Sequence, residues 1–185
     1  STLKMEPQEY EKMYALEDTH WWFLGKRAFA RTFLDMIPKR KESKILDVGC
    51  GTGGMGVLLQ DYGNFYGIDL RPDAIRWASK RGIRTIAFGS ALSLPFSNET
   101  FDLVTAFDLL YHRDIDNDSK ALNEIYRVCK TGGHLLITDS AFNFLRSSHD
   151  VAVHARERYT KRVLGERVRH AGFRIIRLSY TNFFL

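Results

Sequence analysis

The strongest constraint in the sequence is the run over residues 45–56, ILDVGCGTGGMG, in which a short apolar stretch leads directly into a glycine-rich turn. Gly49, Gly51 and Gly53 allow the backbone to turn sharply and to come close to a ligand. A helix that begins after such a turn presents free backbone N–H groups at its first turn. The run therefore predicts a strand, a loop and a helix that together bind a nucleotide-like cofactor.

The glycines alone do not identify that cofactor. The dinucleotide pattern G-x-G-x-x-G fits the run twice, once from Gly49 and once from Gly51. Asp69 lies about 20 residues further on, where a carboxylate can accept hydrogen bonds from both hydroxyls of an adenosine ribose. Because NAD and adenosylmethionine both contain that ribose, Asp69 predicts nucleoside binding without separating the two.

Asp47 separates them, because it lies inside the predicted strand and two residues before the first glycine. A carboxylate at this position repels the pyrophosphate of NAD by like charge. The methionine part of adenosylmethionine carries an ammonium and a sulfonium, so a carboxylate beside it causes no such repulsion. The position of Asp47 therefore favours adenosylmethionine over NAD.

The alternation of short apolar runs with longer amphipathic stretches after residue 43 predicts an α/β fold, a Rossmann-like doubly wound and mostly parallel sheet with helices on both faces. We expect strands at 44–48, 65–69, 83–87, 102–108, 133–139 and 173–180. We expect helices near 53–61, 72–80, 117–129 and 158–171. Pro72 suits a first helical turn, and the Thr131-Gly132-Gly133 run is expected to end one helix and begin a strand.

The segment before the sheet is expected to form a helical cap. Residues 7–36 look helical and carry an aromatic cluster, and residues 38–43 form a basic linker. We therefore divide the chain into an N-terminal helical cap and linker, 1–43, and a cofactor-binding domain, 44–185, which form one globular unit.

Charge is unevenly distributed along the chain. Residues 146–185 carry nine Lys/Arg against three Asp/Glu, and the rest of the chain is slightly acidic. This basic segment is either a surface for phosphates, nucleic acid or anionic lipid, or a solvated helix face. No apolar stretch approaches the roughly 18 residues that span a bilayer, so we expect a cytoplasmic protein. Cys50 and Cys129 form no metal or disulfide spacing, and we assign no metal site.

A third sequence element completes a family pattern. The runs GSALSLPF at 89–96 and ETFDLV at 99–104, together with the glycine turn and Asp69, make the chain resemble a class I S-adenosylmethionine-dependent methyltransferase of the type that modifies small molecules. The resemblance covers most of residues 44–175. It implies S-adenosyl-L-methionine as the cofactor and S-adenosyl-L-homocysteine as the product. It also implies a seventh, antiparallel strand, which the remaining sequence is too short to supply.

The resemblance implies a role for each matching residue. The methionine part of the cofactor is expected against Asp47, Gly49, Cys50, Gly51, Gly53, Phe107 and Asp108. Asp69 is the expected ribose ligand, Leu70 lies beside the adenine, and Ser90 and Ala91 border the base. The family often has Asp where Ser90 stands, which makes recognition of the base depend more on backbone contacts.

The segment at 20–27, HWWFLGKR, resembles one found ahead of this domain in bacterial and archaeal methyltransferases of cell-surface and glycan gene neighbourhoods. Because the carboxylate of the cofactor needs a charged or amide donor, either Lys26 or Arg27 pairs with it, or the two form a solvated pair on the surface.

Methyl transfer from a sulfonium is an in-line displacement, and a base is needed only when the acceptor must lose a proton. His112, just after the fourth predicted strand, is the first candidate base, and Tyr111 and Asp139 share its end of the sheet. The inserted segment at 147–160 supplies two further catalytic candidates, His149 and His154. With Arg158 they either form a lid over an anionic acceptor or are exposed residues ahead of a helix that Thr160 caps. His134 is expected to be structural.

The sequence therefore predicts a methyltransferase that acts on a small-molecule, lipid-linked or sugar-linked acceptor, which is either neutral or anionic. Two alternatives stay open: an NAD-dependent oxidoreductase, and a non-catalytic cofactor-binding module that contacts a partner through its basic tail. Nucleic acid is not an expected partner. The apolar end at 183–185 suggests a peripheral membrane contact, and we expect a monomer or a homodimer.

Overall fold

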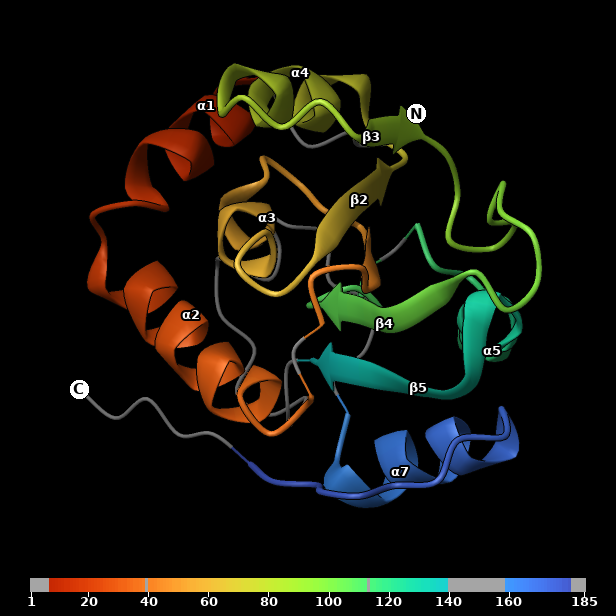
Figure 1. Cartoon of the computed structure of the whole chain (residues 1–185). Coiled ribbons are helices and arrows are strands. Elements are labelled where there is room, and N and C mark those ends of the chain that lie inside the picture. Colours follow the sequence, from red (N-terminus) through yellow and green to blue (C-terminus); the bar gives the residue numbers. More distant parts are fainter. Residues whose placement is uncertain (1–6, 39, 113, 140–158, 181–185) are drawn as a thin grey trace.

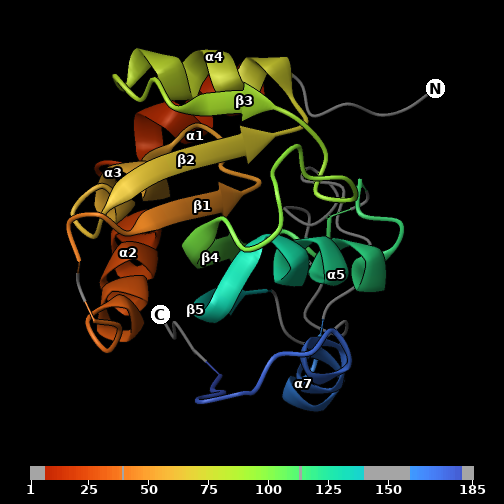
Figure 2. The same ribbon diagram turned by 45° about the vertical axis from the view of Figure 1, so that its right-hand side comes forward.

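A central parallel sheet organises the chain in the computed structural model, which describes residues 7–38, 40–112, 114–139 and 159–180. Five strands lie in the order β3-β2-β1-β4-β5 and all neighbouring pairs are parallel. Their bounds are β1 Lys44–Val48, β2 Asn64–Asp69, β3 Ile86–Phe88, β4 Phe101–Phe107 and β5 Cys129–Thr138. Figure 1 shows the strands between the helices, and Figure 2 shows β1, β2 and β3 running in the same direction.

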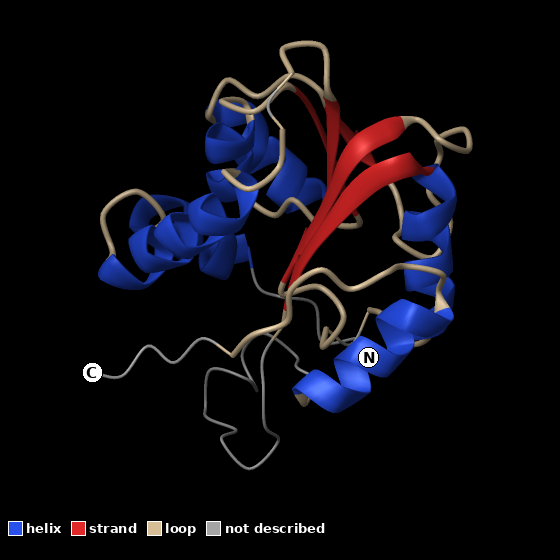
Figure 3. Ribbon diagram, turned by 60° about the horizontal axis from the view of Figure 1, so that its bottom comes forward, coloured by secondary structure: helices blue, strands red, loops and turns tan. Residues whose placement is uncertain are grey.

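Helices cover both faces of this sheet (Figure 3). Their bounds are α1 Pro7–Leu16, α2 Trp21–Leu34, α3 Gly54–Leu59, α4 Pro72–Lys80, α5 Asp118–Val128 and α7 Lys161–His170. One core lies between the sheet and α5 with α7, and a second lies between the sheet and α2 with α3. Within β1, Ile45 belongs to one core and Leu46 to the other, as the alternation of side chains along a strand requires. The α/β prediction is confirmed.

Local signals explain where the helices begin. The side chain of Asn117 accepts a hydrogen bond of 2.9 Å from the backbone N–H of Lys120 and so caps α5. Thr160 caps α7 in the same way. Pro72 occupies the first turn of α4, which confirms the role expected for this proline.

The N-terminal segment forms two helices and not one continuous cap helix. Helix α1 packs against α4, and α2 lies beside α3 (Figure 1). The side chain of His20 accepts a hydrogen bond from the N–H of Trp22 and caps α2, so the chain can change direction between the two helices.

The predicted sixth strand is wrong. Within residues 159–180, the described part of the C-terminal region, no strand forms, and residues 173–180 are irregular chain with a bend at Ile176. The N–H of Phe173 donates to the carbonyl of Val168, which ties this chain to the end of α7 and not to the sheet. Phe173 and Ile175 pack against the core while Ile176 is exposed, so alternating burial reproduced the pattern of a strand.

The expected start of the fifth strand is also wrong. Helix α5 ends at Val128, and β5 begins at Cys129, ahead of the Thr131-Gly132-Gly133 run. Cys129 pairs with Phe101 and His134 with Leu103, so the glycines form an irregularity inside the ladder. A φ of +77° at Gly132 accommodates it.

Candidate functional site

The glycine loop lies at the carboxyl end of β1, where parallel α/β sheets bind ligands. Gly49, Gly51 and Gly53 have φ values of +77°, +54° and +84°. These left-handed conformations favour glycine over every other residue. The N–H groups of Gly49 and Cys50 donate to the carbonyl of Ile68 at 2.8 and 3.0 Å, which fixes the loop beside the end of β2.

Asp47 is buried beneath this loop, with 2% of its surface exposed. The hydroxyl of Thr105 on β4 donates a hydrogen bond of 2.7 Å to its Oδ1. Burial raises the pKa of Asp47 to about 7, and the negative charge of Asp69 adds to the effect. A nearby ammonium group, such as that of a methionine moiety, would compensate the buried carboxylate.

Asp69 joins the glycine loop to the end of β2. Its Oδ2 accepts the N–H of Gly51 and its Oδ1 accepts the N–H of Arg71, both at 2.9 Å. Burial raises the pKa of Asp69, and the two backbone hydrogen bonds act in the opposite direction. Each carboxylate oxygen has a second lone pair, so Asp69 can accept ribose hydroxyls while it holds the loop. The geometry fits the expected role.

The residues expected beside the adenine line the same hollow as Asp69. Leu70 is exposed, Ser90 is half-buried and Ala91 is buried. The hydroxyl oxygen of Ser90 accepts the N–H of Leu92 at 3.1 Å, which leaves it able to donate to a base edge. Their contacts with the base stay a prediction.

At the methionine end, Asp108 has an unusual left-handed φ of 52° and donates its N–H to the carbonyl of Thr138 at 2.8 Å. Its carboxylate forms an ion pair with Lys26 of α2. Arg27 instead pairs with Asp18 at 2.8 Å. Of the two cations expected to bind the cofactor carboxylate, Lys26 therefore contacts the β4 end of the site directly. Both roles stay predictions.

The thiol of Cys50 is buried and packs toward the strand next to the loop. A Cβ atom on Gly67 of β2 would lie 2.9 Å from its sulfur. Burial raises the pKa of the thiol, so it stays neutral. The backbone of Cys50, and not its sulfur, is thus the part suited to a cofactor contact.

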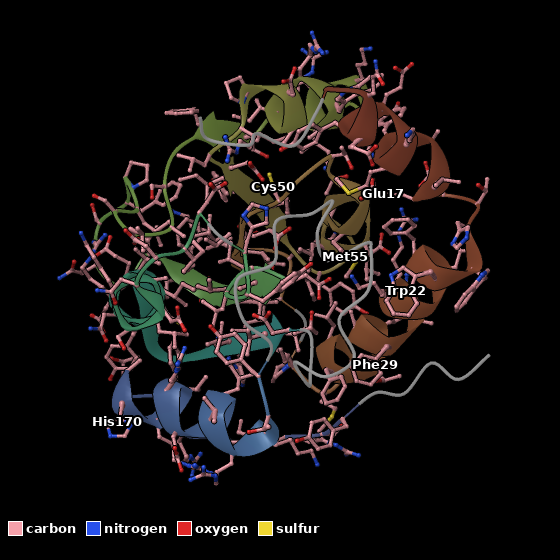
Figure 4. The ribbon with its side chains drawn as sticks, turned by 180° about the vertical axis from the view of Figure 1, so that it is seen from behind. Glu17, Trp22, Phe29, Cys50, Met55 and His170 are labelled. Carbon is pink, nitrogen blue, oxygen red and sulfur yellow. The ribbon has the colours of Figure 1, made fainter. Side chains whose placement is uncertain are left out.

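A buried network under the glycine loop was not predicted from the sequence. Glu17, directly after α1, accepts hydrogen bonds from the Thr52 hydroxyl at 2.6 Å and from Arg81 at 2.9 Å. Arg81 also donates to the carbonyl of Thr52 at 3.0 Å. Figure 4 shows Glu17 at the end of α1, with Trp22 and Phe29 projecting from α2. The first cap helix is therefore bound to the loop itself.

The predicted acid–base residues separate into two groups. His149, His154 and Arg158 lie outside the described residues, so the expected lid stays a prediction. Asp139 accepts the N–H groups of Leu110 and Tyr111 at 2.9 and 3.1 Å. These bonds hold the turn after β4, and a catalytic role for Asp139 stays a prediction.

His112 lies in that turn, and it lines the hollow together with Asp69. Its Nδ1 is 3.4 Å from Oδ2 of Asp114 and 3.3 Å from the backbone N of the same residue. Asp114 in turn binds Arg71, the neighbour of the ribose acid. No sequence spacing links Arg71 to Asp114, and this contact was missed.

The hollow that contains these residues has a volume of about 1930 Å³. It extends from the glycine loop past α2 to the exposed face of β5. Ligand pockets commonly measure roughly 300–1,000 Å³, so the space bounded by the described residues is larger than a cofactor requires.

Comparison with known proteins agrees with the geometry. A family model for a methyltransferase domain matches residues 46–137. Phosphoethanolamine N-methyltransferase 3 of Arabidopsis thaliana is 30% identical over 77% of this chain and 31% of its own length. Demethylmenaquinone methyltransferase of Symbiobacterium thermophilum is 28% identical over 75% of this chain and 57% of its own length. This chain thus spans less than two thirds of either relative.

Among solved structures, phosphoethanolamine N-methyltransferase 2 of Haemonchus contortus, in complex with S-adenosyl-L-methionine, aligns with a TM-score of 0.75. The two are 20% identical, and the alignment covers 93% of this chain and 43% of that one. At this identity the likeness concerns the fold. The glycine loop, Asp47 and Asp69 all fall inside the region matched by the family model, and the chain belongs to the class I S-adenosylmethionine-dependent methyltransferases.

Proposed function

We propose that this protein transfers a methyl group from S-adenosyl-L-methionine to a small-molecule acceptor. The observation that carries the proposal is the position of Asp69, whose carboxylate holds both Gly51 and Arg71 and still has lone pairs for a ribose. Asp47 supports the choice of cofactor, because a buried acid beside the loop suits an amino acid moiety and opposes a pyrophosphate.

The acceptor is inferred to be a small molecule with an apolar part or a lipid or sugar attachment. The hollow continues from the cofactor residues to half-buried aromatic side chains of α2, among them Phe29 and Phe33. Relatives of this chain include a phosphoethanolamine N-methyltransferase and a demethylmenaquinone methyltransferase. Both acceptor types are therefore suitable first substrates.

His112 is the proposed general base. In the transfer, the bond between sulfur and the methyl carbon breaks as the bond between the acceptor and that carbon forms. The acceptor proton passes to the imidazole of His112, and a positioned base of this kind contributes about 100-fold or more to the rate. A cytoplasmic location and a monomeric or homodimeric state are part of the same proposal.

Titration calorimetry tests the cofactor assignment. S-adenosyl-L-homocysteine is expected to bind and NAD is not, and the reverse result would favour the oxidoreductase alternative. Transfer of a labelled methyl group is then measured with phosphoethanolamine, a demethylated quinol and sugar-linked acceptors. Cofactor binding without labelling of any acceptor would favour a non-catalytic module.

The variant His112→Ala tests the base. We expect kcat to fall by about 100-fold while the Kd for S-adenosyl-L-homocysteine stays within twofold, since a base acts on the transition state. His170→Ala, in the last turn of α7 and exposed, is the matched control. Full activity of His112→Ala would remove the residue from the mechanism without affecting the cofactor assignment.

A further inference from the structure

We propose that Tyr10 of helix α1 is a ligand of the cofactor, and that its hydroxyl donates a hydrogen bond to a ribose hydroxyl of S-adenosyl-L-methionine. The inference rests on the proposed function, since it takes this molecule as the cofactor. The ribose is the part of the cofactor expected at Asp69. Tyr10 would complete that end of the site from a helix that precedes the region matched by the family model.

One face of α1 lies against the glycine loop. Tyr10, Met13 and Glu17 follow one another at spacings of three and four residues, so they share one side of the helix. All three line the hollow that contains the loop. A Cβ atom on Gly51 would lie 3.6 Å from Cε of Met13, and the Thr52 hydroxyl donates a hydrogen bond of 2.6 Å to Glu17. Tyr10 is therefore one turn further along a face that already contacts the loop.

The charges around Tyr10 place its hydroxyl at the ribose end of the hollow. Burial raises the pKa of Tyr10, and among the neighbouring charges that of Asp69 raises it most. Smaller effects come from three residues that lie between β2 and α4 or in the turn after β4, namely Arg71, Asp114 and Asp73. Because its pKa is raised, the phenol stays protonated, and a protonated phenol can donate a hydrogen bond.

The Tyr10 hydroxyl is available to a ligand. Within the described residues, it makes no hydrogen bond to Asp69 or to any other group. The fully enclosed side-chain polar atoms without a partner in this part of the chain are Nε1 of Trp77 and Oγ1 of Thr138, and the Tyr10 hydroxyl is not one of them. Since only 6% of the residue is exposed, the ring is buried while the hydroxyl reaches the open space of the hollow.

A ribose hydroxyl can bind Tyr10 and Asp69 at the same time. Its O–H donates to the Asp69 carboxylate, and its oxygen keeps lone pairs that can accept the O–H of Tyr10. A carboxylate cannot donate a hydrogen bond and a protonated phenol can, so the two side chains are complementary partners for one hydroxyl. Asp69 also holds the N–H groups of Gly51 and Arg71, whereas the Tyr10 hydroxyl holds no part of the described backbone. The hydroxyl of Tyr10 is therefore suited to a ligand and not to a structural contact.

Removal of this hydroxyl should leave α1 in place, because other residues dock the helix. Arg81 donates to the carbonyl of Tyr14 at 2.8 Å and to the carboxylate of Glu17 at 2.9 Å. The ring of Tyr14 packs on Trp77 of α4, with 4.8 Å between the ring centroids. The variant Tyr10→Phe keeps the buried ring and removes only the hydroxyl, so it separates cofactor binding from the docking of α1.

Titration calorimetry with S-adenosyl-L-homocysteine is the first measurement. Tyr10→Phe is expected to raise the Kd about fivefold, which corresponds to the loss of one neutral hydrogen bond. Tyr14→Phe is the matched control, because Tyr14 lies on the same helix but packs on α4 and does not line the hollow. The control should leave the Kd unchanged. Urea denaturation without cofactor should give both variants the wild-type midpoint, as expected if α1 stays docked.

Cofactor analogues identify the contact. The 2′-deoxy and 3′-deoxy forms of S-adenosyl-L-homocysteine each lack one ribose hydroxyl. If Tyr10 donates to one of these hydroxyls, its removal should weaken binding to the wild type about fivefold more than binding to Tyr10→Phe. Equal losses of affinity in the two proteins, for both analogues, would show that Tyr10 does not contact the ribose and would overturn the inference.

The inference and the proposed function fail in different ways. If the wild type binds S-adenosyl-L-homocysteine and Tyr10→Phe binds it with the same Kd, the inference is overturned and the proposed function is unaffected. If the wild type does not bind S-adenosyl-L-homocysteine, both are overturned. An equal loss of affinity in Tyr10→Phe and Tyr14→Phe would also overturn the inference, because the effect would then belong to the helix and not to the Tyr10 hydroxyl.

Discussion

Arg81 at the end of α4 lies 2.9 Å from Glu17 at the end of α1, and both side chains are almost fully enclosed, at 6% and 11% exposure. The same guanidinium donates to the carbonyl of Tyr14 at 2.8 Å and pairs with Asp18. One side chain therefore binds the first cap helix to the cofactor-binding domain. Its removal leaves buried acceptors without a donor, which is more costly than the net value of the ion pair.

We predict that Arg81→Ala lowers the free energy of unfolding by about 3 kcal/mol, measured by urea denaturation. Arg76→Ala, on the same helix and in an exposed pair with Asp73, should change it by less than about 0.5 kcal/mol. Glu17→Gln should cost less than Arg81→Ala, because burial raises the pKa of Glu17 and disfavours its charge. Equal losses in the free energy of unfolding for Arg81→Ala and Arg76→Ala would contradict the conclusion that Arg81 binds the first cap helix to the cofactor-binding domain.

Gly54 tests the contact between Glu17 and the glycine loop. A Cβ atom on this residue would lie 2.5 Å from Cδ of Glu17, which is closer than real contacts allow. We predict that Gly54→Ala destabilises the protein by about 1–3 kcal/mol through overpacking. In a Glu17→Ala background the cost should nearly disappear, and a double-mutant cycle measures that coupling. An additive cycle would show that the two residues do not meet.

Asp69→Ala should weaken cofactor binding by about 100-fold while the fold stays intact. Two hydrogen bonds from ribose hydroxyls to a carboxylate are worth on the order of 3 kcal/mol together, which corresponds to about 100-fold in Kd. Calorimetry with S-adenosyl-L-homocysteine measures the loss, and circular dichroism reports the fold. Asp73→Ala, at the start of α4, is the matched control. Unchanged affinity of Asp69→Ala would overturn the site assignment.

The raised pKa of Asp47 predicts that the free energy of unfolding depends on pH. Its pKa rises from an ordinary 3.8 to about 7 in the folded chain, so the folded state binds the proton more tightly than the unfolded state. The contribution of Asp47 to stability is therefore complete below pH 4 and is lost as pH rises to about 7. A shift of about three units corresponds to roughly 4 kcal/mol at most.

Asp47→Asn removes this titration and keeps an acceptor for the Thr105 hydroxyl. Relative to the wild type, the variant should gain stability between pH 5.5 and pH 8, measured by denaturation without cofactor. If the difference in the free energy of unfolding between Asp47→Asn and the wild type stays constant across this range, the prediction is contradicted.

Much of the fold and part of the site could be predicted from local sequence. Positive φ at three positions favours glycine, and an acid at the end of the second strand is placed by the strand itself, so the positions of Gly51 and Asp69 in the fold agree with the prediction. Apolar residues that pack on a core, such as Phe173 and Ile175, do not distinguish a strand from irregular chain, which is why residues 173–180 were assigned wrongly.

The contacts that complete the site could not be found in this way. Glu17 meets Thr52, and Arg71 meets Asp114, across 35 and 43 residues of sequence. These two contacts form only when segments distant in the sequence pack together. No short sequence pattern predicts that packing. Asp139 was placed at the end of the fifth strand by its sequence position, but its hydrogen bonds to the N–H groups of Leu110 and Tyr111 were not predicted.

The family model begins at residue 46, yet the acid that neutralises Arg81 comes from residue 17. A protein expressed from the matched region alone would expose one side of the glycine loop to water and leave a buried guanidinium without its carboxylate. The region matched by the family model is thus shorter than the set of residues that supports the glycine loop here. In this chain, the helices ahead of the matched region are part of the structure that supports the glycine loop.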